Sequence, residues 1–95
     1  MERKLGKEEI RKELKHIRKW RIVNGKLHKE FRLGGFDNAI RFINKLRPIA
    51  NKMNHHPELY NVYDKVVVDL VTHDSGGLTA LDFEFAKKVD KIKRS

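Results

Sequence analysis

The first apolar residues of the chain recur with the spacing of a helix. Within residues 7–18, apolar side chains lie three or four positions apart and charged residues separate them. This spacing places the apolar side chains on one helical face. Glu8 and Glu9 lie in the first turn and cations lie in the last, as the helix dipole favours. We therefore expect a helix over residues 7–18.

Two short strand-like segments follow this helix. Residues 20–23 lead into Asn24-Gly25, a pair that favours a two-residue hairpin turn because both positions tolerate positive φ. Residues 27–33 alternate apolar and polar side chains, which is typical of a strand with one face in water. Lys29 interrupts the apolar face, and a strand near a sheet edge tolerates this interruption.

A long apolar stripe with helical spacing covers residues 36–53, and Pro48 lies within it. Proline lacks the backbone N–H that a helix interior uses, so Pro48 should kink or break the helix. The stripe keeps its phase beyond Pro48, and we therefore expect one kinked helix.

The next segment, residues 58–73, has an extended pattern. Val66, Val68 and Leu70 share one face, whereas Val67 and Asp69 lie on the other. A bend is expected at residues 63–65, which makes the segment one bent strand or two strands.

A glycine-containing loop over residues 75–77 precedes the last helix. Thr79 is a suitable N-cap, and Asp82 lies three positions later as a capping-box partner. Leu78 and Phe83 occupy the two positions of a hydrophobic staple.

This order of elements predicts the fold class. Helix, two strands, helix, two strands and helix indicate an α+β fold, in which three helices cover one face of a small antiparallel sheet of about four strands. We expect one domain over residues 1–95. The other sheet face is expected to be partly exposed or used in assembly.

The charge balance raises the question of a nucleic-acid partner. The chain has 22 Lys and Arg against 13 Asp and Glu, a net charge of +9. Its cations are spread over all three predicted helices and mixed with acidic residues, and neither a zinc finger nor an RNA-binding aromatic motif is present. We interpret the charge as a solvated surface and do not expect nucleic acid. A basic nucleic-acid-binding domain remains an alternative hypothesis.

Several protein classes are excluded by what the sequence lacks. It contains no cysteine, which excludes disulfides, thiolate zinc sites and iron–sulfur clusters. No stretch approaches the roughly 18 apolar residues of a membrane span, and the charged N-terminus has no apolar signal core. We expect a cytoplasmic protein with no membrane partner.

Three of the five histidines lie where neither a helix nor a strand needs them. His55 and His56 are adjacent and precede Pro57, and His73 is expected to end a strand. Imidazole has an ordinary pKa of about 6.5, so several imidazoles facing one pocket suit a reaction that removes one proton while delivering another. Two alternatives stay open: the histidines have no function, or His55, His73 and Asp82 bind zinc.

One motif joins these histidines to an aspartate. It consists of the His-His-Pro run at 55–57, then Tyr63, His73 and Asp82. These residues at this spacing resemble the signature of the pterin-4a-carbinolamine dehydratases. The resemblance covers roughly residues 10–90 and extends upstream through Trp20, Phe31, Phe36, Ala39 and Phe42.

The resemblance implies a hydro-lyase that dehydrates 4a-hydroxytetrahydrobiopterin to quinonoid dihydropterin and water, a step of tetrahydrobiopterin recycling. His55, His56 and His73 would form its acid/base set, and Asp82 would orient or charge-stabilise one of them. It also implies that no metal or cofactor is needed, that the pterin is the substrate, and that the protein is a homodimer or homotetramer. The implied substrate-binding residues are His55, His56, Pro57, Thr72, His73, Asp74 and Ser75.

A non-catalytic assembly or regulatory module on the same fold is the other alternative. The family usually carries a charged residue four positions before the first histidine, where this chain has Asn51. A family member also serves as the dimerisation cofactor of a homeodomain transcription factor, and this sequence gives no signal for that role.

Overall fold

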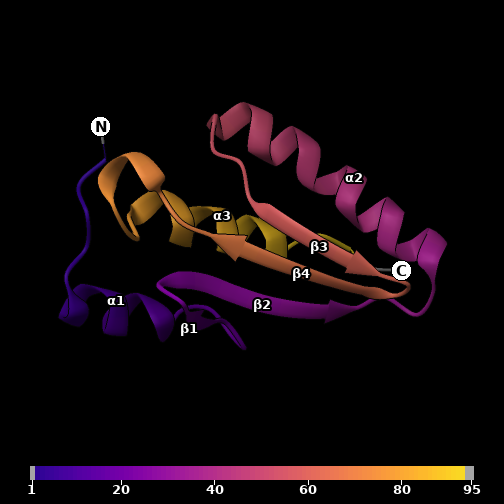
Figure 1. Ribbon diagram of the computed structural model, residues 1–95, viewed down its shortest axis with the longest axis horizontal. Coiled ribbons are helices and arrows are strands. Elements are labelled where there is room, and N and C mark those ends of the chain that lie inside the picture. Colours follow the sequence, from indigo (N-terminus) through magenta and orange to yellow (C-terminus); the bar gives the residue numbers. More distant parts are fainter. Residues whose placement is uncertain (1, 94–95) are drawn as a thin grey trace.

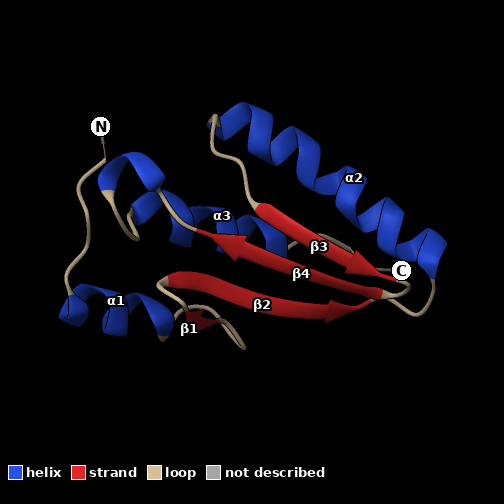
Figure 2. Ribbon diagram, in the orientation of Figure 1, coloured by secondary structure: helices blue, strands red, loops and turns tan. Residues whose placement is uncertain are grey.

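The computed structural model describes residues 2–93 and shows helices packed beside one four-stranded sheet (Figure 1). The elements along the chain are α1 (Lys7–Leu14), β1 (Arg21–Val23), β2 (Lys26–Arg32), α2 (Phe36–Met53), β3 (Glu58–Val62), β4 (Lys65–Leu70), the short 3-10 helix η1 (His73–Ser75) and α3 (Ala80–Asp90). Their order, seen by element type in Figure 2, confirms the predicted α+β class.

The strands pair in the order β1-β2-β4-β3, and every neighbouring pair is antiparallel. The hairpin between β1 and β2 turns at Asn24 and Gly25, whose φ angles of 52° and 76° match the positive values expected for such a turn. Between β2 and β4, Leu27 lies opposite Leu70 and Phe31 opposite Val66. These residues therefore share one face of the sheet.

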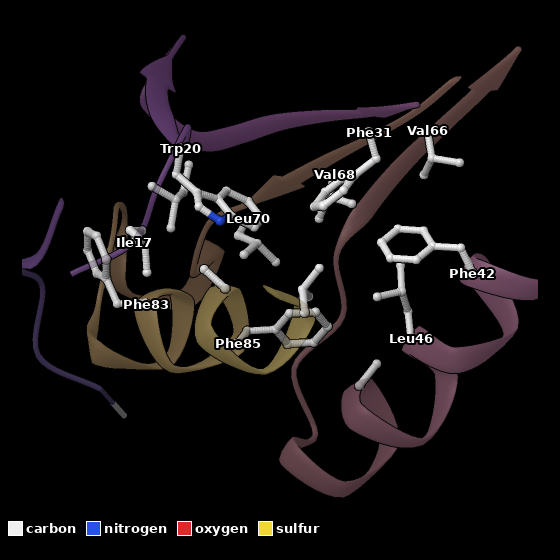
Figure 3. Close-up of a cluster of buried hydrophobic side chains, with 14 of the residues drawn as sticks. Ile17, Trp20, Phe31, Phe42, Leu46, Val66, Val68, Leu70, Phe83 and Phe85 are labelled. Carbon is white, nitrogen blue, oxygen red and sulfur yellow. The ribbon is translucent and has the colours of Figure 1, made fainter. Parts of the chain in front are cut away.

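This apolar face packs against α2 and α3 to form the core. Figure 3 shows side chains from β2, β4, α2 and α3 meeting between the layers. The rings of Phe31 and Phe42 lie 4.8 Å apart between their centres. Helix α1 contributes the partly buried Ile10 and Leu14 to the same core.

Helix α2 continues unbroken through Pro48, as the phase of its apolar stripe predicts. It ends at Asn54, whose left-handed conformation (φ 49°) turns the chain out of the helix. The Asn54 N–H still bonds to the carbonyls of Ala50 and Asn51, so these two carbonyls at the end of the helix have a hydrogen-bond donor. This turn places residues 55–57 beside the start of α3 rather than along the axis of α2.

The start of α3 confirms the predicted capping box. The Leu81 N–H donates to Thr79 Oγ1 over 3.2 Å, and the Thr79 N–H donates to Asp82 Oδ2 over 2.9 Å. Both Leu78 and Phe83 are buried, as expected for the staple that accompanies such a box.

Two predicted element boundaries are wrong. The first helix ends at Leu14 instead of continuing to residue 18, and residues 15–19 form turns in which Lys19 has a φ of 67°. The apolar spacing predicted too long a helix because Ile17, which lies in this non-helical turn, is buried in the core like a helical residue. The extended segment 58–73 is two strands, which is one of its two predicted forms, and Tyr63 (φ 51°) turns the chain between β3 and β4 within the predicted bend. His73 begins η1 and does not end a strand.

Lys29 lies near a sheet edge, as predicted, and an ion pair also stabilises it there. Strand β2 lies between β1 and β4 and is not an edge strand. Strand β1 is so short that it covers only residues 26–28 of β2. The Lys29 side chain is 11% exposed, and its Nζ lies 2.8 Å from Asp90 Oδ1 at the end of α3. An ion pair therefore allows this cation on the apolar face.

No helix in the described residues is long and apolar enough to cross a membrane.

Candidate active site

A buried histidine–aspartate pair lies where the end of α2 meets the start of α3. His55 Nε2 is 2.7 Å from Asp82 Oδ1, and the two side chains are 9% and 0% exposed. The His55 N–H bonds to the Ala50 carbonyl over 3.1 Å, which ties the residue to the last turn of α2. The Phe85 ring meets the imidazole edge-on, with 6.2 Å between centres. Backbone and side-chain contacts together fix the imidazole.

Asp82 is held by further hydrogen bonds. Its Oδ2 accepts from Thr72 Oγ1 and from the Thr79 N–H, each over 2.9 Å. The two threonine hydroxyls lie 2.8 Å apart and are buried. Thr72 reaches this place because it follows β4 and forms an isolated antiparallel bridge with Gly77. These two donors fix the orientation of the carboxylate and leave its Oδ1 facing His55.

An open hollow of about 490 Å³ lies beside this pair. It is formed at the end of the sheet where, in Figure 1, the η1 turn lies near the last turn of α2. A cleft of this size falls within the usual range for small-ligand sites. Its lining residues are Glu2, Met53, Asn54, His55, Thr72, Asp74, Ser75 and Leu81.

The other two candidate histidines lie outside this lining. His73 is 74% exposed, and its Nε2 lies 3.4 Å from Glu58 Oε2 at the start of β3. His56 is exposed and lies 3.2 Å from Asn51 Oδ1. Asn51 therefore provides a hydrogen-bond partner at a position where the family usually carries a charge. Each imidazole thus has one polar partner on the surface of the protein.

The structure brings most of the predicted site residues to one place. His55, Asp82, Thr72, Asp74 and Ser75 all border the hollow or its buried wall. His56 and His73 lie in the adjoining segments, on the surface. Pro57 is half-buried and follows the histidine pair directly.

Glu58 contacts a candidate histidine and was not among the predicted site residues. Its carboxylate bonds to Lys26 Nζ over 2.7 Å and also faces His73. The bond from Lys26, with the charges of Lys26 and His73, holds the pKa of Glu58 below its ordinary value. No sequence signal identified Glu58, because Lys26 and His73 lie on β2 and η1 and meet it only when the sheet forms.

The contact between Thr72 and Asp82 had no sequence signal either. Thr79 was recognised as a helix cap, but the capping box gave no sign that its hydroxyl meets Thr72. The N-terminal residue Glu2 is a third omission, since it lines the hollow from the far end of the sequence.

The zinc alternative is not supported by the arrangement of side chains. It requires His55, His73 and Asp82 to converge, whereas His73 faces Glu58. Across residues 2–93, no group of three or more His, Cys, Asp and Glu side chains could hold a metal ion.

A second histidine–aspartate pair lies on the other face of the sheet. The alternation of β2 predicts a solvent-facing His28, but its Nδ1 lies 2.7 Å from Asp69 Oδ1 and its side chain is 19% exposed. The two residues are direct partners across β2 and β4. This pairing across the sheet accounts for the burial that the sequence pattern did not predict.

Comparison with known proteins places this chain in a family. The family model described as pterin 4 alpha carbinolamine dehydratase matches residues 3–92. A relative from Metallosphaera sedula is 45% identical, over 96% of this chain and 95% of that protein. Another, from Solibacter usitatus, is 45% identical, over 97% of each. Both carry the family name as a provisional assignment.

Solved structures show the same fold. A protein from Brucella melitensis described as a transcriptional coactivator/pterin dehydratase has a TM-score of 0.87 at 32% identity, covering 92% of this chain and 95% of that one. A pterin dehydratase-like RuBisCO assembly factor of the alpha-carboxysome has a TM-score of 0.65 at 23% identity, covering 79% of this chain and 89% of that one. The second likeness concerns the fold alone. From its sequence and its fold, the chain belongs to the pterin 4 alpha carbinolamine dehydratase family.

Proposed function

We propose that this protein dehydrates a 4a-hydroxytetrahydropterin to the quinonoid dihydropterin and water. The C4a–O bond breaks, and the departing hydroxide takes a proton from an acid and leaves as water. A base removes the proton from N5, and the electron pair left there forms the C4a=N5 double bond. The observation that carries the proposal is the buried His55–Asp82 pair beside a hollow of suitable size.

We assign the proton transfers to His55 and His73. His55 has one ring nitrogen committed to Asp82, so its other nitrogen serves the substrate. His73 follows Thr72 directly, next to the lining of the hollow, and its exposed ring can turn toward a bound ligand. His56 holds the ligand and can share protons, whereas Asp82 orients His55. Each positioned acid or base typically contributes about 10²–10⁴-fold.

The polar groups around the hollow are suited to a flat heterocycle with several hydrogen-bonding edges. Asp74 and Ser75 line it from η1, and Pro57 shapes the chain that enters β3. These groups would fix the pterin ring relative to His55.

A dehydration assay on the purified protein tests this proposal. His55→Ala and His73→Ala are each expected to lower kcat/KM by about 10²–10⁴-fold, while dialysis against EDTA should leave it unchanged because the proposed reaction uses no metal or cofactor. Activity that both substitutions leave intact would sink the histidine assignment, and loss of activity in EDTA would sink the metal-free one. His16→Ala is the matched control, since His16 is exposed in the turn after α1.

A homodimer or homotetramer is part of the proposal. Strand β3 lies at the sheet edge and leaves Leu59, Tyr60 and Val62 substantially exposed. An exposed apolar edge strand of this kind favours pairing with another chain. Light scattering would show a dimer or larger species, and a monomer at micromolar concentration would contradict this part of the proposal.

A non-catalytic assembly module is the second candidate function. The exposure of His56 and His73, and the uncharged Asn51 beside His56, favour it. The RuBisCO assembly factor shares the fold. A folded protein that shows no dehydration with several 4a-hydroxypterins would support this candidate.

A further inference from the structure

A buried line of hydrogen bonds leads from the first turn of α3 to His55. The Leu81 N–H donates to Thr79 Oγ1 over 3.2 Å, and Thr79 Oγ1 lies 2.8 Å from Thr72 Oγ1. Thr72 Oγ1 donates to Asp82 Oδ2 over 2.9 Å, and Asp82 Oδ1 meets His55 Nε2 at 2.7 Å. All four side chains are buried, with Thr79 and Asp82 at 0% exposure.

The number of available protons determines the direction of this line. A threonine hydroxyl has a single proton to donate. Thr72 uses its proton on the carboxylate of Asp82, so the proton shared by the two hydroxyls belongs to Thr79. Thr79 Oγ1 accepts from the backbone of α3 at the same time. The line therefore has one orientation, from the helix backbone to Asp82.

This orientation determines which nitrogen of His55 carries the proton. Asp82 Oδ2 accepts from two donors, and a carboxylate has only acceptor atoms. Its Oδ1 can only accept, so His55 Nε2 is the donor. In the neutral imidazole Nδ1 is then unprotonated.

His55 Nδ1 is also the ring nitrogen that remains available to a ligand. Within residues 2–93, every fully buried side-chain nitrogen or oxygen has a hydrogen-bond partner. Nε2 is the ring nitrogen of His55 that is bonded, and the residue lines the hollow. Nδ1 is therefore not sealed inside the protein, and because His55 lines the hollow we assign Nδ1 to the ligand, as a base or as a hydrogen-bond acceptor.

We infer that Thr72 is a positioning residue: together with Thr79 it aims Asp82 so that His55 keeps its proton on Nε2 and presents Nδ1 to the ligand. Thr72 thus acts through Asp82 and not by touching the pterin, which changes the role that the family resemblance implied for it. The catalytic consequence rests on the proposed dehydration, whereas the tautomer of His55 does not depend on it.

Nitrogen-15 NMR of the imidazoles tests the tautomer without any activity. The wild-type protein at neutral pH is expected to show His55 protonated on Nε2, with a proton that exchanges slowly with water. In Thr72→Val the shape is kept but the hydroxyl is lost, so this proton should exchange faster, and Thr72→Ser should restore slow exchange. A wild-type protein protonated on Nδ1 would overturn the inference, as would equal exchange in the wild type and Thr72→Val.

Kinetics then separate positioning from ligand contact. If Thr72 positions Asp82, Thr72→Val lowers kcat by about 10- to 100-fold with KM nearly unchanged, and Thr72→Ser recovers most of the loss. A raised KM at constant kcat would show instead that Thr72 binds the substrate. Val89→Ala is the control for destabilisation, because Val89 is fully buried on α3 and outside the hydrogen-bond line. If the wild type has no dehydratase activity, the proposed function fails and the NMR result still decides the tautomer.

Discussion

Asp82 has two roles that meet in one carboxylate. Its Oδ2 caps the first turn of α3 by accepting from the Thr79 N–H, and its Oδ1 accepts from His55. Because Asp82 is 0% exposed, each hydrogen bond that its carboxylate accepts replaces one that water would donate. The residue that completes the capping box of α3 therefore also holds the imidazole beside the hollow.

At this scale we predict that Asp82→Asn destabilises the fold. The amide nitrogen of asparagine is a donor, and at least one of the donors facing Asp82 then loses its acceptor. A buried donor without a partner costs about 1–3 kcal/mol in the free energy of unfolding. Urea unfolding measures this cost, with Asp74→Asn as the exposed control, expected within about 0.5 kcal/mol of wild type. Equal stability of Asp82→Asn and wild type would show that the carboxylate is not required as the cap.

At the scale of an element, hydrogen bonds join the segment before α1 to the loop before α3. The Leu5 N–H bonds to the Leu78 carbonyl over 2.8 Å, and Ser75 Oγ donates to the Glu2 carbonyl. Glu9, in the first turn of α1, accepts from Arg3 over 2.7 Å and from the Gly6 N–H over 3.0 Å. The segment thus lies against the loop that borders the hollow.

We predict that this segment loosens in acid. The hydrogen bond from Arg3 and that from the Gly6 N–H lower the pKa of Glu9 to about 2. A carboxyl whose pKa is lower in the folded state stabilises that state above its ordinary pKa of about 4.3, and the contribution disappears as the pH falls toward 2. NMR titration of the Glu9 carboxyl and of the Gly6 amide measures this. A Glu9 midpoint near 4.3 would contradict it, and Arg3→Ala should bring the midpoint back toward that value.

Across the whole molecule, one polar cluster ties the first strand region to the last helix. Asp90 Oδ2 accepts from Trp20 Nε1 over 2.9 Å, and its Oδ1 pairs with Lys29 Nζ at 2.8 Å. The Lys29 amino group also lies 4.9 Å from the centre of the Phe31 ring. Trp20 and Asp90 are 70 positions apart in sequence, so this cluster forms only when the sheet and α3 have packed.

Asp90→Ala is expected to lower the free energy of unfolding by about 1.5–3 kcal/mol. The substitution leaves the nearly buried Lys29 amino group without its anion and the Trp20 N–H without an acceptor. Urea unfolding followed by the fluorescence of Trp20 measures the loss. Glu84→Ala on the exposed side of α3 is the control, expected within about 0.5 kcal/mol of wild type. The cluster would be unimportant for stability if both variants unfold at the same urea concentration.

Elements that depend on interactions between residues close in sequence were predicted from the sequence. The apolar spacing predicted α2 even across Pro48, Asn24-Gly25 predicted the hairpin, and Thr79 with Asp82 predicted the start of α3. Each of these signals acts between residues a few positions apart. The histidine motif predicted the family for a similar reason, because residue types and spacing are properties of the chain itself.

Tertiary structure decided what those residues contact. The sequence placed His55 and Asp82 in one motif, but only packing of α2 against α3 brought them to 2.7 Å and buried them. The tertiary structure also places His73 next to Glu58, and it brings the Thr72 hydroxyl within hydrogen-bond distance of Asp82. Hydrogen bonds between distant segments depend on the relative placement of whole elements, to within about an ångström. Spacing along the chain cannot supply that placement, which is why the sequence pointed to candidate site residues and the fold determined their partners.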